Sequence, residues 1–135
     1  VGEDRLPDET QVHEDGRVDL TVASVEEIVE PGRIDFGGGE LDPARTAPHE
    51  RHFRNPDDDY QWWTLENGQY RCSFNETLAA DATVLVQPRA AVLERGATLP
   101  TVRTDALDPL PISVGGAGLH LKENARVATV VAVIE

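Results

Sequence analysis

The chain has 135 residues, a length typical of one domain with a sizeable core. Its formal net charge is −13, and its basic side chains are eleven arginines and one lysine, so we expect no nucleic-acid partner. It has no apolar run of the roughly 18 residues that a membrane span requires, so we expect no membrane partner. The single cysteine, Cys72, cannot form an internal disulfide, which favours a cytoplasmic location.

The charge is unusual in kind and in distribution. An acidic surface with almost no lysine resembles that of halophilic proteins, whose carboxylates hold water while molar salt screens their repulsion. Residues 1–67 carry 18 acidic and 6 basic side chains, whereas residues 68–135 carry 7 and 6. We therefore expect an anionic ligand to bind the second half of the chain.

Strand and turn signals dominate the first half. Residues 17–24 alternate between an apolar face and a polar face that carries Asp19, which must meet solvent or find a partner. The spacing of apolar residues predicts a short helix over 25–29, and the turns around 33–36 favour a short strand there. Residues 42–60 are rich in Pro, Asp, Arg and His and predict a long surface loop.

The second half reads as further strands with one short helix over 90–94. The strands are expected over residues 69–75, 82–87, 112–121 and 126–134, the third being interrupted by glycines. Tyr70, Cys72 and Phe74 share one face of their strand. The last strand is almost wholly apolar and β-branched, as expected for a strand buried on both faces. This pattern predicts an all-β sandwich or barrel.

Three other features have a structural as well as a functional interpretation. His49 and His52 have a spacing that metal ligands use on a helix, but a Pro-rich loop favours solvated side chains. The glycines of 115–118 lack the ending of a phosphate-binding loop and favour a turn. Of the adjacent Trp62 and Trp63, one is expected in the core and the other at a subunit contact.

The segment 85–99 carries the strongest functional signal. An apolar strand ends at Pro88, Arg89 follows, and a short turn or helix then begins. Proline ends a strand ladder, and the amides and the guanidinium beyond it can face an anion. The segment therefore predicts a phosphate site at Arg89.

This segment also resembles the Pro-Arg-Ser-Ser-Leu motif of the dUTPase and dCTP deaminase family, with Ala90 and Ala91 in place of the serines. Further segments resemble archaeal members of that family in the same order along about 120 residues. They are Gln11–Val22 with its Asp-Leu-Thr strand, Glu30–Ile34, Trp62–Glu76, Gly96–Leu99 and Asn124–Ala128. The chain is therefore identified as resembling a divergent, halophile-like member.

The resemblance implies a distorted jelly-roll (a β-clip) with one or two short helices, as a single domain over 1–135. It also implies a homotrimer with nucleoside triphosphate sites between subunits, and Mg²⁺ as cofactor. Family hydrolases convert dUTP to dUMP and pyrophosphate. By position, Asp105 would orient the water or hold the deoxyribose hydroxyl, Asp19 would contact the water shell of the metal, and Arg89 would bind phosphate. The remaining substrate-binding positions are Ala90, Ala91 and Asp108.

Several departures from the family pattern leave two hypotheses open. The alanines remove two hydroxyl groups, Asp108 replaces an aromatic ring against the deoxyribose, and Thr129 replaces a glutamine. Pro109 stands where deaminases carry a glutamate, which disfavours dCTP deamination. The first hypothesis is a Mg²⁺-dependent pyrophosphatase acting on dUTP or a related nucleotide. The alternative is a catalytically inactive homologue that binds a nucleotide or has a structural role.

Overall fold

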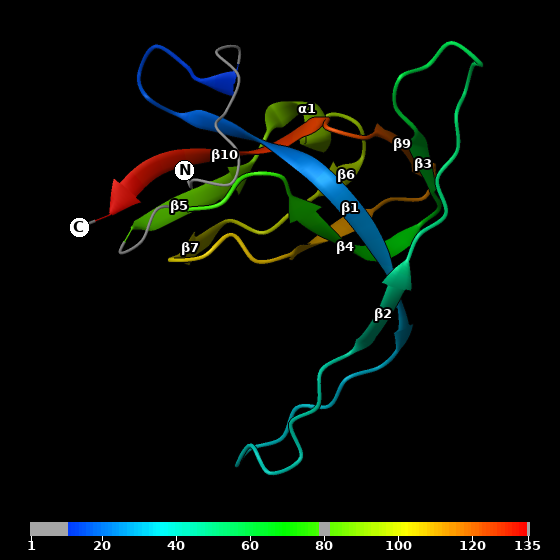
Figure 1. Cartoon of the computed structure of the whole chain (residues 1–135). Coiled ribbons are helices and arrows are strands. Elements are labelled where there is room, and N and C mark those ends of the chain that lie inside the picture. Colours follow the sequence, from blue (N-terminus) through cyan, green and yellow to red (C-terminus); the bar gives the residue numbers. More distant parts are fainter. Residues whose placement is uncertain (1–10, 79–81, 135) are drawn as a thin grey trace.

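The computed structural model describes residues 11–78 and 82–134, which form an antiparallel sheet curled into a half-barrel (Figure 1). The strand order is β6-β8-β4-β1-β10-β5-β7, and β2 pairs with β1. These strands are β1 (Val18–Glu30), β2 (Arg45–Pro48), β4 (Gly68–Phe74), β5 (Thr83–Pro88), β6 (Ala97–Thr98), β7 (Val102–Thr104), β8 (Leu110–Val114) and β10 (Arg126–Ile134). A separate ladder joins β3 (Trp62–Leu65) to β9 (Leu119–Lys122), and α1 (Ala90–Leu93) follows β5. The all-β prediction is confirmed.

Strand β1 is the central element because it pairs with three partners in turn. Its first residues pair with β10, its middle with β4 and its far end with β2. The register shifts between Leu20 and Thr21 against β10, and between Val22 and Ser24 against β4. Such bulges bend a strand and increase its twist, which allows one strand to serve successive partners around a curled sheet.

The core lies inside this curl and draws on nearly every strand. Its largest fully buried apolar side chains are Trp63, Leu20, Leu65, Ile112, Val22, Val25, Val84, Val86 and Val127. The predicted face of β4 is confirmed, since Tyr70, Cys72 and Phe74 are all buried. Burial raises the pKa of the Cys72 thiol to about 12, so this cysteine is an inert core residue. Among the described residues, no helix is long and apolar enough to cross a membrane.

Three predictions for the first half differ from the structure. Residues 25–29 are not helical but continue β1, since Val25, Ile28 and Val29 are β-branched and the backbone pairs with β4 and β2. Residues 42–60 are not loop throughout, because β2 occupies 45–48 and satisfies the edge of β1. The strand expected over 33–36 is reduced to an isolated bridge between Arg33 and Asp42. The helix expected over 90–94 is confirmed as α1.

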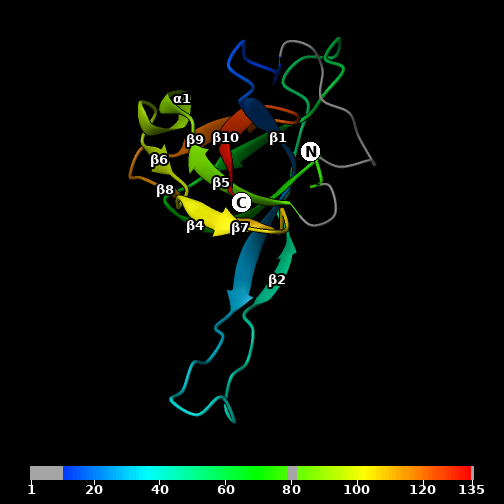
Figure 2. The same ribbon diagram turned by 90° about the vertical axis from the view of Figure 1, so that its left-hand side faces the viewer.

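The paired ends of β1 and β2 project from the body as an arm, defined here as residues 26–48. Figures 1 and 2 show it extending well beyond the rest of the sheet in both views. Backbone hydrogen bonds join Arg33 and Asp42 in both directions, and the two side chains form an ion pair. Beyond this bridge, the tip exposes Ile34, Phe36 and Leu41.

The turn between β8 and β9 depends on Gly118. Its φ of +81° lies in the left-handed region, and a Cβ there would lie 2.7 Å from the Leu65 carbonyl oxygen. We predict that Gly118→Ala lowers the free energy of unfolding by about 2 kcal/mol through strain and this clash. Chemical denaturation in molar KCl measures it. Gly37→Ala is the matched control, because a Cβ at Gly37 meets nothing within 4 Å. Equal stability of the two variants would contradict this account of the turn.

Candidate anion-binding site around Asp19

Asp19 lies on β1 opposite Thr129 of β10 and is fully buried. The Thr129 hydroxyl donates to Oδ1 at 2.9 Å, and Nε2 of His13 lies 2.9 Å from the same oxygen. Arg126 approaches Oδ2 at 3.5 Å, and Nε of Arg89 lies 3.6 Å from Oδ1. A side chain expected to meet solvent or find a partner has therefore found four partners.

The basic partners of Asp19 reach the surface while the carboxylate does not. The side chains of Arg89, Arg126 and His13 are 31%, 35% and 35% exposed. Two guanidinium groups on one carboxylate leave one unit of positive charge among these three side chains, and the second buried carboxylate nearby, that of Glu76, offsets it. In a chain of net charge −13, Arg89 and Arg126 therefore bring two partly exposed guanidinium groups to one point of the surface, and guanidinium groups are suited to contact an anion.

The pKa of Asp19 reflects two opposing effects, that of burial and that of its partners. Burial raises the pKa of the carboxyl, but the hydrogen bonds from His13 and Thr129 and the charges of Arg89 and His13 outweigh it. The net result is a pKa below the ordinary value of 3.8. Asp19 is therefore an anion that holds its cationic partners in place at neutral pH.

A second buried carboxylate, Glu76, fixes the backbone beside Asp19. It accepts hydrogen bonds from the Thr21 amide at 2.8 Å, from the Thr21 hydroxyl at 2.7 Å and from the Gln11 side-chain amide at 3.0 Å. The same Gln11 nitrogen donates to the Asp19 carbonyl oxygen at 3.0 Å. These bonds hold the segment before β1 against the sheet and so bring His13 to Asp19.

Arg89 lies where the sequence predicts, directly after the last residue of β5. Its backbone N–H donates to the Val127 carbonyl at 3.0 Å, which fixes the strand end against β10. Ala90 and Ala91 then open α1, with Ala90 exposed and Ala91 half-buried. Neither alanine carries a hydroxyl group, so the predicted phosphate contact at this point is left to guanidinium groups and backbone amides.

Asp105 and Asp108 lie apart from this cluster within the chain. Both are exposed, and Asp105 borders a shallow hollow of about 370 Å³ that Thr83, Arg103 and Thr104 also line. The pairing of Val84 with Thr104 places Asp105 beside the start of β5, whereas Arg89 follows its end. Six residues of strand separate these points, or roughly 20 Å. One chain therefore does not bring Asp105 and Arg89 into a common site.

The surroundings of Asp19 do not fit a magnesium ion. Mg²⁺ prefers oxygen ligands and retains several waters, whereas this carboxylate is fully buried and faces two guanidinium groups. Within residues 11–78 and 82–134, no three His, Cys, Asp or Glu side chains lie close enough together to hold a metal ion. The predicted contact of Asp19 with the water shell of a metal therefore has no support in this chain alone.

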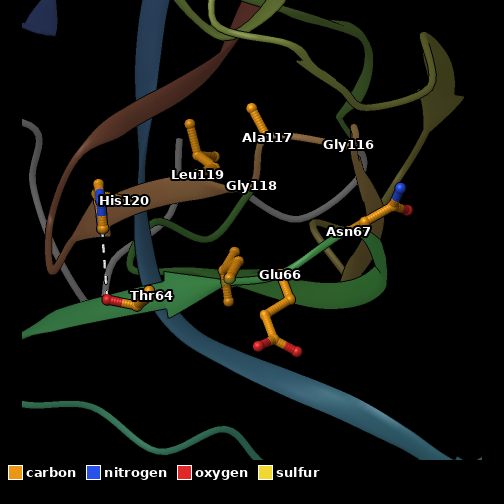
Figure 3. A pocket seen from close by; sticks show the side chains of 9 residues that line it. Thr64, Glu66, Asn67, Gly116, Ala117, Gly118, Leu119 and His120 are labelled. Atoms are coloured by element: carbon orange, nitrogen blue, oxygen red, sulfur yellow. Dashed lines mark hydrogen bonds between the residues drawn. The ribbon is translucent and has the colours of Figure 1, made fainter.

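A separate hollow of about 360 Å³ lies between β3, β9 and the glycine turn (Figure 3). The Thr64 hydroxyl and Nδ1 of His120 lie 3.3 Å apart at one end, and Asn67 and Gly116 lie at the other. Glu66 adds a negative charge to this lining. The hollow is therefore less suited to an anion than the surface around Arg89.

Sequence reasoning missed three members of the cluster, His13, Arg126 and Glu76. The available signal was the polar face of β1, which carries Asp19 and Thr21. If that face is buried, its side chains need polar partners from elsewhere in the chain. His13 lies six residues before Asp19, Glu76 lies 55 residues after Thr21, and Arg126 belongs to the last strand. No local pattern links such distant positions.

Comparison with known proteins adds no assignment, because no family model matches the chain and no curated protein is significantly similar to it. Membership of the dUTPase and dCTP deaminase family stays a prediction from the motifs. Functional inference therefore depends on those motifs and on the geometry described above.

The lowered pKa of Asp19 predicts an acid-sensitive contribution to folding. A carboxyl whose folded-state pKa is depressed stabilises the protein above its unfolded pKa, and that stabilisation is lost as the pH falls through the folded value. We expect Asp19→Asn to destabilise the protein by about 3 kcal/mol at pH 7, because it leaves two guanidinium groups without their counter-charge. As the pH falls below 4, we also expect the free energy of unfolding of Asp19→Asn to decrease less than that of the wild type.

Denaturant unfolding between pH 3 and 7 in molar KCl measures both effects. Asp59→Asn, in the exposed loop before β3, is the matched control and should follow the wild type. An Asp19→Asn profile that parallels the wild type at every pH would contradict the assignment.

Proposed function

We propose that the chain is a dUTPase-like, Mg²⁺-dependent pyrophosphatase acting on dUTP or a related deoxynucleoside triphosphate. The proposal rests on one observation. Arg89, which follows the end of β5, and Arg126 both contact the buried carboxylate of Asp19. The end of β5 is where the sequence motif predicts the phosphate-binding arginine.

The two arginines suit a polyphosphate because their orientation is fixed from inside the protein. A guanidinium group has five N–H donors, and Arg89 contacts Asp19 through Nε at 3.6 Å, which engages only part of its fork. The exposed part can bind phosphate oxygens in the bidentate geometry that arginine favours. His13 and Thr129 contact the same carboxylate and help to hold it in place.

Hydrolysis in this proposal requires a second copy of the chain. Asp105 lies roughly 20 Å from Arg89 along β5, so the proposed site combines Arg89 of one subunit with the carboxylate of another. This agrees with a homotrimer that has its sites between subunits. Asp105 would accept a proton from water as the oxygen bonds to the α-phosphorus. The bond from that phosphorus to the bridging oxygen breaks, and pyrophosphate leaves.

Magnesium in this proposal accompanies the substrate, because the residues around Asp19 do not fit the ion. When bound to the triphosphate, Mg²⁺ would neutralise part of its charge. It would also reduce repulsion between the nucleotide and an acidic protein.

A second candidate function is nucleotide binding without catalysis. It is favoured by Ala90 and Ala91, which offer no hydroxyl to phosphate, and by the exposed Asp108, which offers no ring to a deoxyribose. Deamination of dCTP stays disfavoured, because Pro109 has no side-chain acid.

Product analysis distinguishes these candidates. Protein in molar KCl with Mg²⁺ is incubated separately with dUTP, dCTP, dTTP and UTP, and the products are separated by chromatography. We expect a monophosphate and pyrophosphate from dUTP or a related deoxynucleotide. Asp105→Asn should lower the rate at least about a hundredfold with the fold intact, because the general base is lost. The control Asp59→Asn should retain the wild-type rate.

Wild-type turnover in Asp105→Asn would remove Asp105 from the mechanism. A folded, oligomeric wild-type protein that binds dUTP and leaves it unchanged would instead establish the non-catalytic candidate.

A further inference from the structure

The tip of the arm presents an apolar side chain on a preformed turn. The Asp35 carboxylate accepts hydrogen bonds from the backbone N–H groups of Gly38 and Glu40, which holds the turn together. Phe36 is fully exposed and Ile34 is 91% exposed. Single exposed apolar side chains are common, but here Ile34, Phe36 and Leu41 are exposed together at the tip of one projecting hairpin, and a grouped apolar surface marks an interaction site.

A complementary pocket lies between α1, β3, β9 and the start of β10. Its volume is about 200 Å³, and an apolar cavity of about 150 Å³ can hold benzene. Its apolar lining residues are Trp62, Ala91, Val92, Leu119, Leu121, Ala125 and Val127. Its charged lining residues are Arg95, Lys122 and Arg126, and the described residues add no acidic side chain to it. We call it the basic pocket.

The arm tip and the basic pocket match in chemistry as well as in size. The tip combines an aromatic ring with the charges of Asp35 and Glu40, and the pocket combines an apolar floor with Lys122 and two arginines. Of these arginines, Arg95 lies 3.8 Å from Glu94 and Arg126 lies 3.5 Å from Asp19. Lys122 is therefore the cation of this pocket that forms no ion pair with a carboxylate among the described residues. A chain of net charge −13 has few surfaces that would attract an arm tip with both acidic and apolar side chains. The basic pocket is such a surface.

The two features lie at opposite ends of the molecule. In Figures 1 and 2 the arm extends away from α1 and β9 in both views. A chain therefore cannot place its own arm tip in its own pocket. We propose that the arm tip of one copy inserts Phe36 into the basic pocket of a second copy.

This contact joins two different surfaces of the same chain. Each copy carries one tip and one pocket, so successive contacts form a closed ring wherever the rotation between copies allows it. The contact also gives Trp62 a place at a subunit interface, since its ring lines the pocket. The contact concerns assembly and needs no hydrolysis, but the basic pocket shares Arg126 and Ala91 with the proposed nucleotide site, so an inserted tip would compete with a nucleotide for these residues.

The first test measures the mass of the full chain in molar KCl by light scattering after size exclusion. We expect an oligomer for the wild type. Phe36→Asp should weaken association about a hundredfold and give monomers at micromolar concentration, because a charge replaces the central aromatic contact. Phe53→Asp, at an exposed phenylalanine outside the arm, is the matched control and should leave the mass unchanged. A monomeric wild type, or an unchanged mass for Phe36→Asp, would overturn the proposal.

The second test traps the contact between copies. Gly37→Cys keeps Phe36 and has open space for its side chain, while Ala91→Cys places a thiol in the pocket lining. On mixing under mild oxidation, these two variants should form a mixed disulfide dimer, identified by its mass. Cys72 is buried and its thiol pKa is raised, so it does not compete. Gly37→Cys mixed with Arg103→Cys, on the exposed strand β7, is the control. Equal yields from the two mixtures would contradict insertion of the tip.

Discussion

The site and much of the sheet depend on one buried charge, that of Asp19. Its carboxylate contacts β10 through Thr129 and Arg126, the end of β5 through Arg89, and the segment before β1 through His13. A buried carboxylate is costly unless it is paired and hydrogen-bonded, and here it is both. The same contacts that offset its burial hold two guanidinium groups close together and at the surface, where they would otherwise repel each other.

The acidic composition of the chain determines under which conditions this cluster can bind an anion. Long-range repulsion from a net charge of −13 would keep an anionic ligand away in dilute salt. In molar salt the screening length falls to about 3 Å, so only contacts at close range affect binding. Under those conditions a few guanidinium groups fixed in place can bind a phosphate despite the charge of the whole chain.

The sequence predicted local features well and distant pairings poorly. Alternation located β1 and β4, and Pro88-Arg89 located the end of β5, because these signals lie in adjacent residues. Residues 25–29 showed helical spacing, but pairing with β4 and β2 determined their conformation. The partners of Asp19 and Glu76 come from several parts of the chain, and only the folded sheet brings them together.

The proposed role of Asp19 is to hold Arg89 and Arg126 as a site for phosphate. Calorimetric titration with inorganic triphosphate tests it directly, without requiring catalysis or a particular base. We expect the wild type to bind, Arg89→Gln to bind at least about tenfold more weakly, and Arg45→Gln, at an exposed arginine on β2, to match the wild type. Equal affinity in the wild type and Arg89→Gln, or no binding to the wild type, would contradict the claim.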